Sequence, residues 1–329
     1  MTHDPAESGT TSVTCIEHLV LDATRVCEAA AIAASRHVGR GDEKTADQAA
    51  VDAMRRALNR IDMQGRVVIG EGERDEAPML YIGEEVGTGK GTRIDIALDP
   101  LEGTTLCATG GANSLAVLAF SGAGGLLHAP DTYMEKIAVG ADLPEGVVGL
   151  DRSPGENMQR LAEASGRKID DLVALILNRP RHDDLIREVR KTGARVRLIQ
   201  DGDVAGVIAT TRPETGIDIY MGIGGAPEGV LAAAALRCVG GHFQGRLAFR
   251  DHGERSRARA MGITDPDRIF SIGELASGDV VFCATGVTDG WLLRGVREED
   301  ARFITQSLVM SPSAVRVITA DRALHEGGA

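Results

Sequence analysis

The feature that most constrains the fold is an alternation of short apolar runs and helical patterns in the second half of the chain. The expected elements, alternately strand and helix, are at residues 172–177, 183–191, 196–199, 204–210, 217–221 and 227–239. Alternation at this spacing predicts a parallel sheet that is covered by helices on both faces. Because ligands of such sheets bind beyond the carboxyl ends of the strands, these ends are the first place to look for a site.

Charged and flexible residues follow these strands directly. The strand ends carry, in chain order, Arg179-Pro180-Arg181, Asp201-Gly202-Asp203, and Gly225 with Glu228. Forked guanidinium donors suit a phosphate, aspartates can accept hydrogen bonds from sugar hydroxyls, and a glutamate at a helix start can join a metal site. A single arginine of this kind is more often a solvated surface charge. The recurrence of such residues at successive strand ends favours a functional edge.

The first half contains a strand that ends in two acidic residues. In residues 93–105, apolar side chains alternate with small or acidic ones, which is typical of a half-buried strand, and Pro100 followed by Gly103 ends it. Asp99 and Glu102 therefore flank a tight bend, and Thr104 adds a hydroxyl beside them. Converging oxygen ligands of this type suit Mg²⁺ or Mn²⁺.

Asp47 and Glu71 are further candidate ligands in the first half. Residues 45–48 match a capping box, which would place Asp47 in the first turn of a helix that continues to about residue 58. A surface aspartate that stabilises a helix start explains Asp47 equally well. Glu71 follows a short strand at residues 66–69, and the glycines on either side of it allow close approach to a ligand. By this argument either Glu71 or Glu73 could be the ligand.

The remaining patterns complete an α/β prediction, with an α+β first half and an α/β second half. We expect helices at residues 16–38 and 250–261 and strands at residues 113–120, 125–128, 135–139, 280–284, 305–310 and 315–319. Residues 121–124 would form a hairpin loop, so that the first half ends in an antiparallel meander. The expected division is a disordered lead-in at residues 1–14, a metal-binding half at 15–150 and a substrate-binding half at 151–329.

Composition narrows the class of protein. The formal charge of -12 argues against a nucleic-acid partner, which would need a basic face. No apolar run reaches the roughly 18 residues of a membrane span, and the polar start lacks the pattern of a signal peptide. The five cysteines have no paired C-x-x-C spacing, which favours free thiols over disulfides or zinc. We therefore expect a cytoplasmic protein that binds neither membranes nor nucleic acid.

Taken together, these motifs resemble the class II (GlpX-type) fructose-1,6-bisphosphatases, over about residues 16–319. The run Asp99-Pro100-Leu101-Glu102-Gly103-Thr104 resembles the signature of the lithium-sensitive, metal-dependent sugar and inositol phosphatases. The other matching blocks are residues 39–42, 45–47, 68–73, 75–81, 133–136, 179–182, 201–203 and 222–229. The resemblance implies a layered αβαβα sandwich with the site in a cleft between its halves.

The resemblance also implies an activity and its residues. The activity would be hydrolysis of the 1-phosphate of fructose 1,6-bisphosphate, a reaction of gluconeogenesis and sugar phosphate metabolism, by a homo-oligomer that uses Mn²⁺ or Mg²⁺. Metal ligands would be Asp47, Glu71, Asp99, Glu102 and Glu228, which decides for Glu71 over Glu73. Substrate contacts would come from Glu102, Gly103, Thr104, Tyr133, Arg179, Pro180, Arg181, Asp201, Gly202, Asp203 and Gly225. Thr104, Asp47 and Glu71 would be the catalytic residues, with Thr104 either orienting the attacking water or itself attacking the phosphate.

Three alternatives remain open. The sugar could be sedoheptulose 1,7-bisphosphate, since the same metal chemistry serves a longer bisphosphate. The protein could bind phosphosugars with little catalysis, because Glu43 stands where the family usually has lysine. A nucleotide-binding oxidoreductase is suggested by the glycines at residues 222–225, but Pro227 stands where the fingerprint needs its third glycine.

Overall fold

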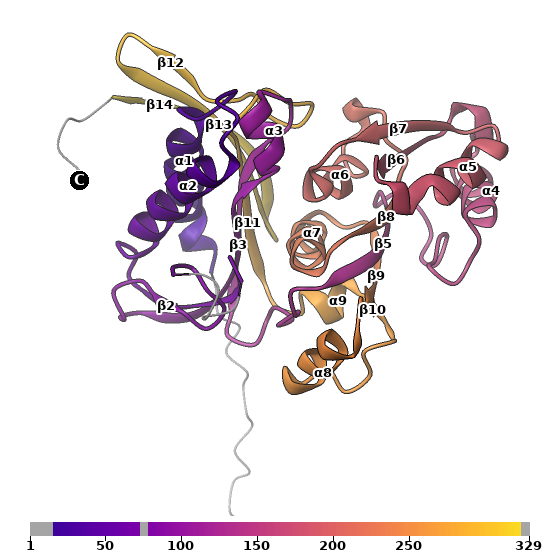
Figure 1. The fold of residues 1–329 in the computed structure, drawn as a ribbon, viewed down its shortest axis with the longest axis horizontal. Coiled ribbons are helices and arrows are strands. Elements are labelled where there is room, and N and C mark those ends of the chain that lie inside the picture. Colours follow the sequence, from indigo (N-terminus) through magenta and orange to yellow (C-terminus); the bar gives the residue numbers. More distant parts are fainter. Residues whose placement is uncertain (1–15, 73–77, 324–329) are drawn as a thin grey trace, which may run out of the picture.

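The computed structural model describes residues 16–72 and 78–323. The expected lead-in at residues 1–14 and Glu73 lie outside the described residues. The described chain forms two sheets with helices between and outside them (Figure 1). The division of the chain at residue 150 remains a prediction. Each sheet takes strands from both sides of this residue.

The first sheet has the strand order β12-β13-β11-β4-β3-β1-β2, with β14 paired to β13. Its strands are β1 (Met63–Ile69), β2 (Glu85–Val86), β3 (Thr92–Glu102), β4 (Leu115–Gly122), β11 (Val280–Gly286), β12 (Arg297–Glu299), β13 (Arg302–Ser311) and β14 (Ala314–Ala323). Its outer face is covered by α1 (Val20–Ser35), which follows the short helix η1 (Glu17–Leu19), and by α2 (Glu43–Leu58). Alternate side chains of β3, among them Ile94, Ile96 and Leu98, pack against these helices.

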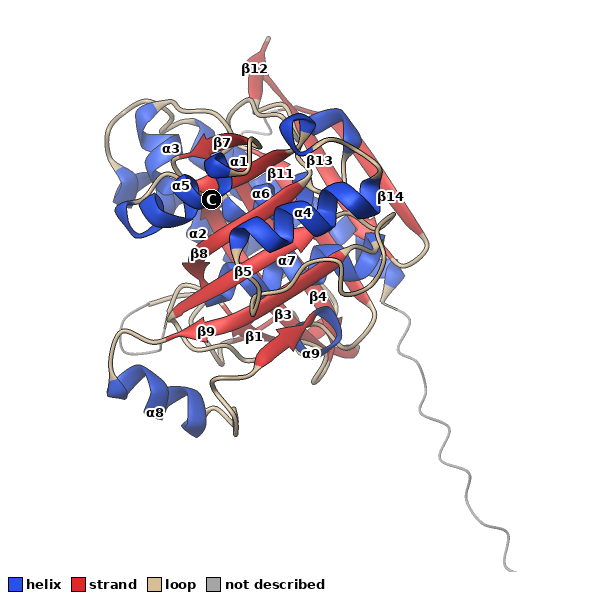
Figure 2. Ribbon diagram, turned by 90° about the vertical axis from the view of Figure 1, so that its right-hand side faces the viewer, coloured by secondary structure: helices blue, strands red, loops and turns tan. Residues whose placement is uncertain are grey.

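The second sheet has the order β10-β9-β5-β8-β6-β7. Its strands are β5 (Tyr133–Val139), β6 (Val173–Leu177), β7 (Arg195–Ile199), β8 (Ile219–Gly225), β9 (His242–Ala248) and β10 (Ile269–Ser271). Helices α4 (Pro154–Ser165) and α5 (Asp183–Lys191) pack on its outer face, and Figure 2 shows α4 in front of these strands. The short helices η2 (Ile169–Asp171), η3 (Pro180–His182) and η4 (Pro213–Thr215) lie in its connections.

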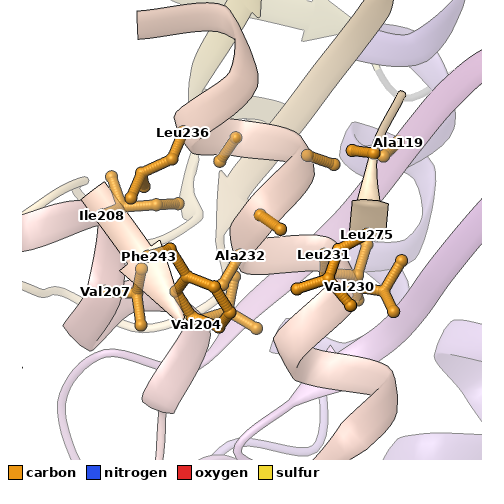
Figure 3. Packing of buried hydrophobic residues seen from close by; sticks show 14 of the residues in the cluster. Ala119, Val204, Val207, Ile208, Val230, Leu231, Ala232, Leu236, Phe243 and Leu275 are labelled. Atoms are coloured by element: carbon orange, nitrogen blue, oxygen red, sulfur yellow. The ribbon is translucent and has the colours of Figure 1, made fainter. Parts of the chain in front are cut away.

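Helices α6 (Asp203–Ala209) and α7 (Ala226–Val239) lie between the sheets. A helix buried on all sides must be apolar on all sides, and residues 229–236 of α7 are all buried. Figure 3 shows Val230, Leu231 and Leu236 packing among side chains of both sheets and of α6. The described residues thus form an αβαβα sandwich, as expected.

The remaining helices lie at the margins of these layers. They are α3 (Thr104–Thr109), directly after β3, α8 (His252–Ala260) and the single turn α9 (Ile272–Leu275). None of the helices in the described part of the chain combines the length and apolar character needed to cross a lipid bilayer.

The expected parallel pairing of the second half is confirmed, because β6 is parallel to both β7 and β8. The expected meander is wrong. Residues 125–128 form only an isolated bridge, Leu126 to Ala276, and residues 121–124 do not join two paired strands. Because β3 and β11 already occupy both edges of β4, the chain leaves this sheet and β5 enters the other one, between β8 and β9.

Candidate active site

A cavity of about 350 Å³ lies between the sheets, where β1 and β3 end and α6 and α7 begin. Carboxylates dominate its lining. Those among the described residues are Asp47, Glu71, Asp99, Glu102, Asp131, Asp201, Asp203 and Glu228. Gly103 and Thr104 also line it. The structure therefore brings together the predicted acidic residues from both halves of the chain.

The parallel pairing of β1 and β3 explains why Glu71, Asp99 and Glu102 meet. Because β1 and β3 are parallel, the carboxyl ends of these two strands lie at the same edge of the sheet. The register of β3 against β4 shifts between Asp99 and Glu102. Residues three apart on a regular strand point to opposite faces, so this bulge is what lets both carboxylates face the cavity.

Asp47 reaches the cavity from α2, but not from the first turn. The expected capping box at residues 45–48 is wrong, because α2 starts earlier. Asp42 is the N-cap, and its Oδ1 accepts a 3.0 Å hydrogen bond from the backbone N–H of Thr45. The hydroxyl of Thr45 also donates to Asp42, at 2.6 Å, and so is not itself a cap. Asp47 is therefore the fifth residue of the helix, in its second turn.

Two glutamates keep a buried oxygen without a hydrogen-bond partner. Glu102 Oε1 accepts a 3.1 Å bond from the backbone N–H of Val204, at the start of α6, whereas Oε2 has no partner among the described residues. The same is true of Glu228 Oε2. Buried polar atoms are rarely left unpaired in native proteins, so these oxygens are suited to a cationic partner.

The raised pKa values of the cavity carboxylates also favour a cationic partner. Burial raises the pKa of Glu71 to about 8, and repulsion from Asp47 and Glu228 adds to the shift. Burial and the nearby Asp203 raise the pKa of Glu228 to about 7, although Lys136 opposes this. Burial also raises the pKa values of Asp99 and Glu102 well above their ordinary range. Lysine, arginine and histidine are absent from the described residues that line the cavity, so the ionised carboxylates repel one another.

The donor set fits hard divalent cations, because it consists of carboxylate oxygens. Among the described residues, however, no His, Cys, Asp and Glu side chains form a group of three or more in the arrangement that holds a metal ion.

Lys136 and Asp131 are parts of this region that the sequence reasoning missed. The Lys136 ammonium pairs with Asp203 and donates a 2.7 Å hydrogen bond to the carbonyl oxygen of Gly225. Its strand face is shared with the fully buried Met134 and Ala138. A lysine on a buried strand face is the signal that could have revealed it. Asp131, in the loop before β5, carries no comparable pattern.

The close approach of backbone and carboxylates explains two glycines that end β8. A Cβ atom on Gly224 would lie 2.1 Å from Asp203 Oδ2, and one on Gly225 would lie 1.9 Å from Glu228 Oε2. Any side chain at these positions would displace a carboxylate of the cavity.

The predicted basic residues lie outside the lining of the cavity, near the strand ends. Arg181 donates from Nε and Nη2 to the carbonyl oxygen of Ile223, at 3.0 and 2.7 Å, and its guanidinium lies 4.9 Å from the centre of the Tyr133 ring. Burial and the charge of Asp203 raise the pKa of Asp201, Arg179 opposes this shift, and Glu43 adds to it. Pro180, Gly202 and Gly225 also lie outside the lining: Pro180 begins η3, Gly202 precedes α6, and Gly225 ends β8.

His182 fixes the turn that holds Arg181. Its Nε2 accepts a 2.7 Å hydrogen bond from the backbone N–H of Ile223, and its Nδ1 lies 2.8 Å from the carbonyl oxygen of Leu177. The ring is therefore neutral, with its proton on Nδ1. Burial lowers the pKa of His182, and the charges of Arg181 and Arg179 lower it further.

Comparison with known proteins identifies a matching family and several relatives of this chain. Residues 17–322 match the family described as bacterial fructose-1,6-bisphosphatase, glpX-encoded. A D-fructose 1,6-bisphosphatase class 2/sedoheptulose 1,7-bisphosphatase of Synechococcus sp. (strain JA-3-3Ab) is 50% identical over 318 residues, which cover 89% of this chain and 91% of that protein. Proteins with the same description from Synechococcus elongatus and Microcystis aeruginosa are 50% and 49% identical, over 88% and 89% of this chain and 91% and 92% of their own lengths.

Proposed function

This chain belongs to the glpX-encoded bacterial fructose-1,6-bisphosphatases, and from this membership we propose that it hydrolyses the 1-phosphate of fructose 1,6-bisphosphate to fructose 6-phosphate and phosphate. The observation that carries the proposal is the cavity between the sheets, where carboxylates from both halves of the chain meet and no basic side chain is among the described lining residues. A phosphatase that works through divalent metal needs such a site.

The metal would be Mn²⁺ or Mg²⁺, held by Asp47, Glu71, Asp99, Glu102 and Glu228. When bound, it supplies positive charge for the transferred phosphoryl group and lowers the pKa of a coordinated water. The partnerless oxygens of Glu102 and Glu228 support their assignment as ligands.

The chain's own groups position the substrate. Thr104, the first residue of α3, would orient the attacking water by hydrogen bonding, beside Asp47 and Glu71 in the same cavity. Contacts to the sugar and to its far phosphate would come from Glu102, Gly103, Thr104, Tyr133, Arg179, Pro180, Arg181, Asp201, Gly202, Asp203 and Gly225. Asp203 is already paired with Lys136, which supports a role in accepting hydroxyl bonds over a role as metal ligand.

Sedoheptulose 1,7-bisphosphate is the second candidate substrate, because the described relatives carry both names. The test is phosphate release from each bisphosphate by the purified protein with Mn²⁺ or Mg²⁺, with ³¹P NMR to identify the remaining phosphate. We expect loss of the 1-phosphate and retention of the terminal one. Loss of the terminal phosphate would contradict the orientation proposed for the substrate.

A weakly catalytic phosphosugar-binding protein remains the candidate from another class. Glu43 is the exposed first residue of α2, and its negative charge interacts electrostatically with Asp201. If phosphate release is absent in the parent but fructose 6-phosphate binds, Glu43→Lys is the variant to assay. We place the protein in the cytoplasm as a homo-oligomer, with a role in gluconeogenesis, as parts of the same proposal.

A further inference from the structure

We propose that Arg250 is a substrate-binding residue that acts with Arg181 and Tyr133 on the phosphate remote from the metals. The proposal rests on the function proposed above and names the residue that completes the receptor for this phosphate. Arg250 follows β9, whereas Arg181 follows β6 and Tyr133 begins β5. These three residues are far apart in the sequence and belong to no common motif.

The sheet brings them together. Tyr133 pairs in register with Ala248 of β9 on one side and with Gly225 of β8 on the other. The guanidinium of Arg250 lies 5.5 Å from the centre of the Tyr133 ring, and that of Arg181 lies 4.9 Å from it. Both guanidinium groups thus lie within the roughly 6 Å over which an aromatic ring attracts a cation.

Arg250 is anchored in a way that leaves donors unused. Its Nε pairs with Glu254, whose side chain is 2% exposed, and its backbone N–H donates to Glu254 Oε2 at 2.7 Å. The hydroxyl of Thr132 donates to the same carboxylate at 2.7 Å. The Nη groups of Arg250 make no hydrogen bond with other described residues, and the Arg250 side chain is 60% exposed. A guanidinium held at one edge and open at the other is suited to bidentate binding of a phosphate.

Arg250 also lies within electrostatic reach of the cavity. The hydrogen bond and the charge of Glu254 raise the pKa of Arg250, and the charge of Asp131, which lines the cavity, adds to this shift. A sugar bisphosphate carries phosphates at both ends, and the carboxylates of the cavity would repel the one that is not bound to metal. The arginines near Tyr133 supply the opposite charge at this margin of the site.

The test measures binding of fructose 6-phosphate, the product that retains only the remote phosphate. Isothermal titration of the Mn²⁺-loaded protein compares the parent with Arg250→Ala, Arg250→Lys and Arg255→Ala. Arg255 is the matched control, because it also stacks on an aromatic ring, Phe249 at 5.0 Å, and pairs with an acidic residue, Asp267, but does not contact Tyr133.

Loss of one charge-assisted, forked contact should raise the Kd for fructose 6-phosphate about tenfold in Arg250→Ala. Arg250→Lys should lie between this variant and the parent, and Arg255→Ala should match the parent. Inhibition by inorganic phosphate, which competes for the metal-bound end, should be unchanged in all variants. An equal Kd in Arg250→Ala and Arg255→Ala would overturn the proposal.

The outcomes separate this inference from the proposed function. A parent that hydrolyses fructose 1,6-bisphosphate, together with an Arg250→Ala variant of unchanged Kd, refutes only the role of Arg250. A parent that releases no phosphate refutes the function, and the binding of fructose 6-phosphate still decides on Arg250. If the buried Glu254 prevents Arg250→Ala from folding, Arg250→Lys carries the test, because it retains the charge that Glu254 needs. An unchanged Kd in Arg250→Lys would then count against the forked contact.

Discussion

The ammonium of Lys136 and the carboxylate of Asp203 form an ion pair beside the cavity, with side chains only 1% and 7% exposed. This pair neutralises one of the clustered carboxylates without any bound cation. It also links β5 to the start of α6, because Lys136 lies on β5 and Asp203 is the first residue of α6.

Lys136→Met should therefore destabilise the protein strongly. Removing one partner of a buried pair costs about 3–5 kcal/mol, because the other charge stays buried and unpaired. Lys191→Met is the control, since its pair with Glu188 is exposed and should contribute about 0–1 kcal/mol. Urea unfolding measures the loss of unfolding free energy in each variant. Equal losses in the two variants would show that the buried pair contributes no more than a surface pair.

The acidic residues of the cavity should make the metal-free protein less stable as the pH rises. The pKa of Glu71 in the folded protein is about 8, whereas the ordinary pKa of glutamate, which applies to the unfolded chain, is 4.5. The folded state therefore binds more protons between these values, and its stability falls from pH 5 to pH 8. His182 acts in the opposite direction, because burial lowers its pKa, so the contribution of Glu71 must be isolated by substitution.

The Glu71→Gln variant isolates the contribution of Glu71 to the pH dependence of stability. The variant should lose less unfolding free energy between pH 5 and pH 8 than the parent does, by at least about 1 kcal/mol, the equivalent of one pKa unit. Glu156→Gln should keep the slope of the parent, because the pKa of Glu156 is lowered and the group is ionised throughout this range. Urea unfolding in EDTA at several pH values provides the measurement. Parallel curves for the parent and Glu71→Gln would contradict the account.

Much of this arrangement could be predicted from the sequence. The alternating apolar runs predicted the parallel pairing around β6, and Gly103 predicted that the strand carrying Asp99 and Glu102 ends there. These features are local, so a short window of sequence contains them. The expected bend at Pro100 is wrong, because β3 continues through Pro100 to Glu102 and changes its register against β4 there. The true N-cap of α2 was also local, but Thr45 and Asp42 both fit the capping pattern, and only the hydrogen bonds decide between them.

Other features depended on contacts between distant segments. The entry of β5 into the other sheet follows from the full edges of β4, one of which is occupied by β11, more than 150 residues later. The place of Arg250 near Tyr133 depends on the register of β5 and β9. Neither partner of these contacts contains information about the other in its own sequence, which is why the sequence reasoning did not reveal them.

Gly225→Ala should weaken metal binding without straining the backbone. The φ of Gly225 is -66°, which alanine adopts readily, but its Cβ would lie 1.9 Å from Glu228 Oε2. Glu228 must then move, and an overpacking cost of about 1–3 kcal/mol corresponds to a loss of Mn²⁺ affinity of about 5- to 150-fold. Gly273→Ala is the control, because nothing lies within 4 Å of its Cβ position. Equal Mn²⁺ affinities in both variants, measured by calorimetric titration, would count against Glu228 as a ligand.

His182→Ala should raise KM for fructose 1,6-bisphosphate and leave kcat nearly unchanged. Without Nε2 as acceptor, the backbone N–H of Ile223 loses its partner, and the carbonyl that holds Arg181 loses its fixed orientation. His242→Ala is the control, since His242 also lies within hydrogen-bond distance of a backbone carbonyl, that of Leu143, but away from Arg181. Steady-state kinetics at neutral pH separate the two parameters. A fall in kcat with unchanged KM would contradict a positioning role.

The most direct test of the central claim is phosphate release from fructose 1,6-bisphosphate by the metal-stripped protein, before and after addition of Mn²⁺ or Mg²⁺. The parent and an Asp142→Ala variant, which changes an exposed aspartate, should regain activity with metal. Asp99→Ala, which removes a carboxylate from the cavity, should not. Metal-dependent release that is lost only in Asp99→Ala is the result that the account predicts. Full activity without metal, or in Asp99→Ala, would contradict it.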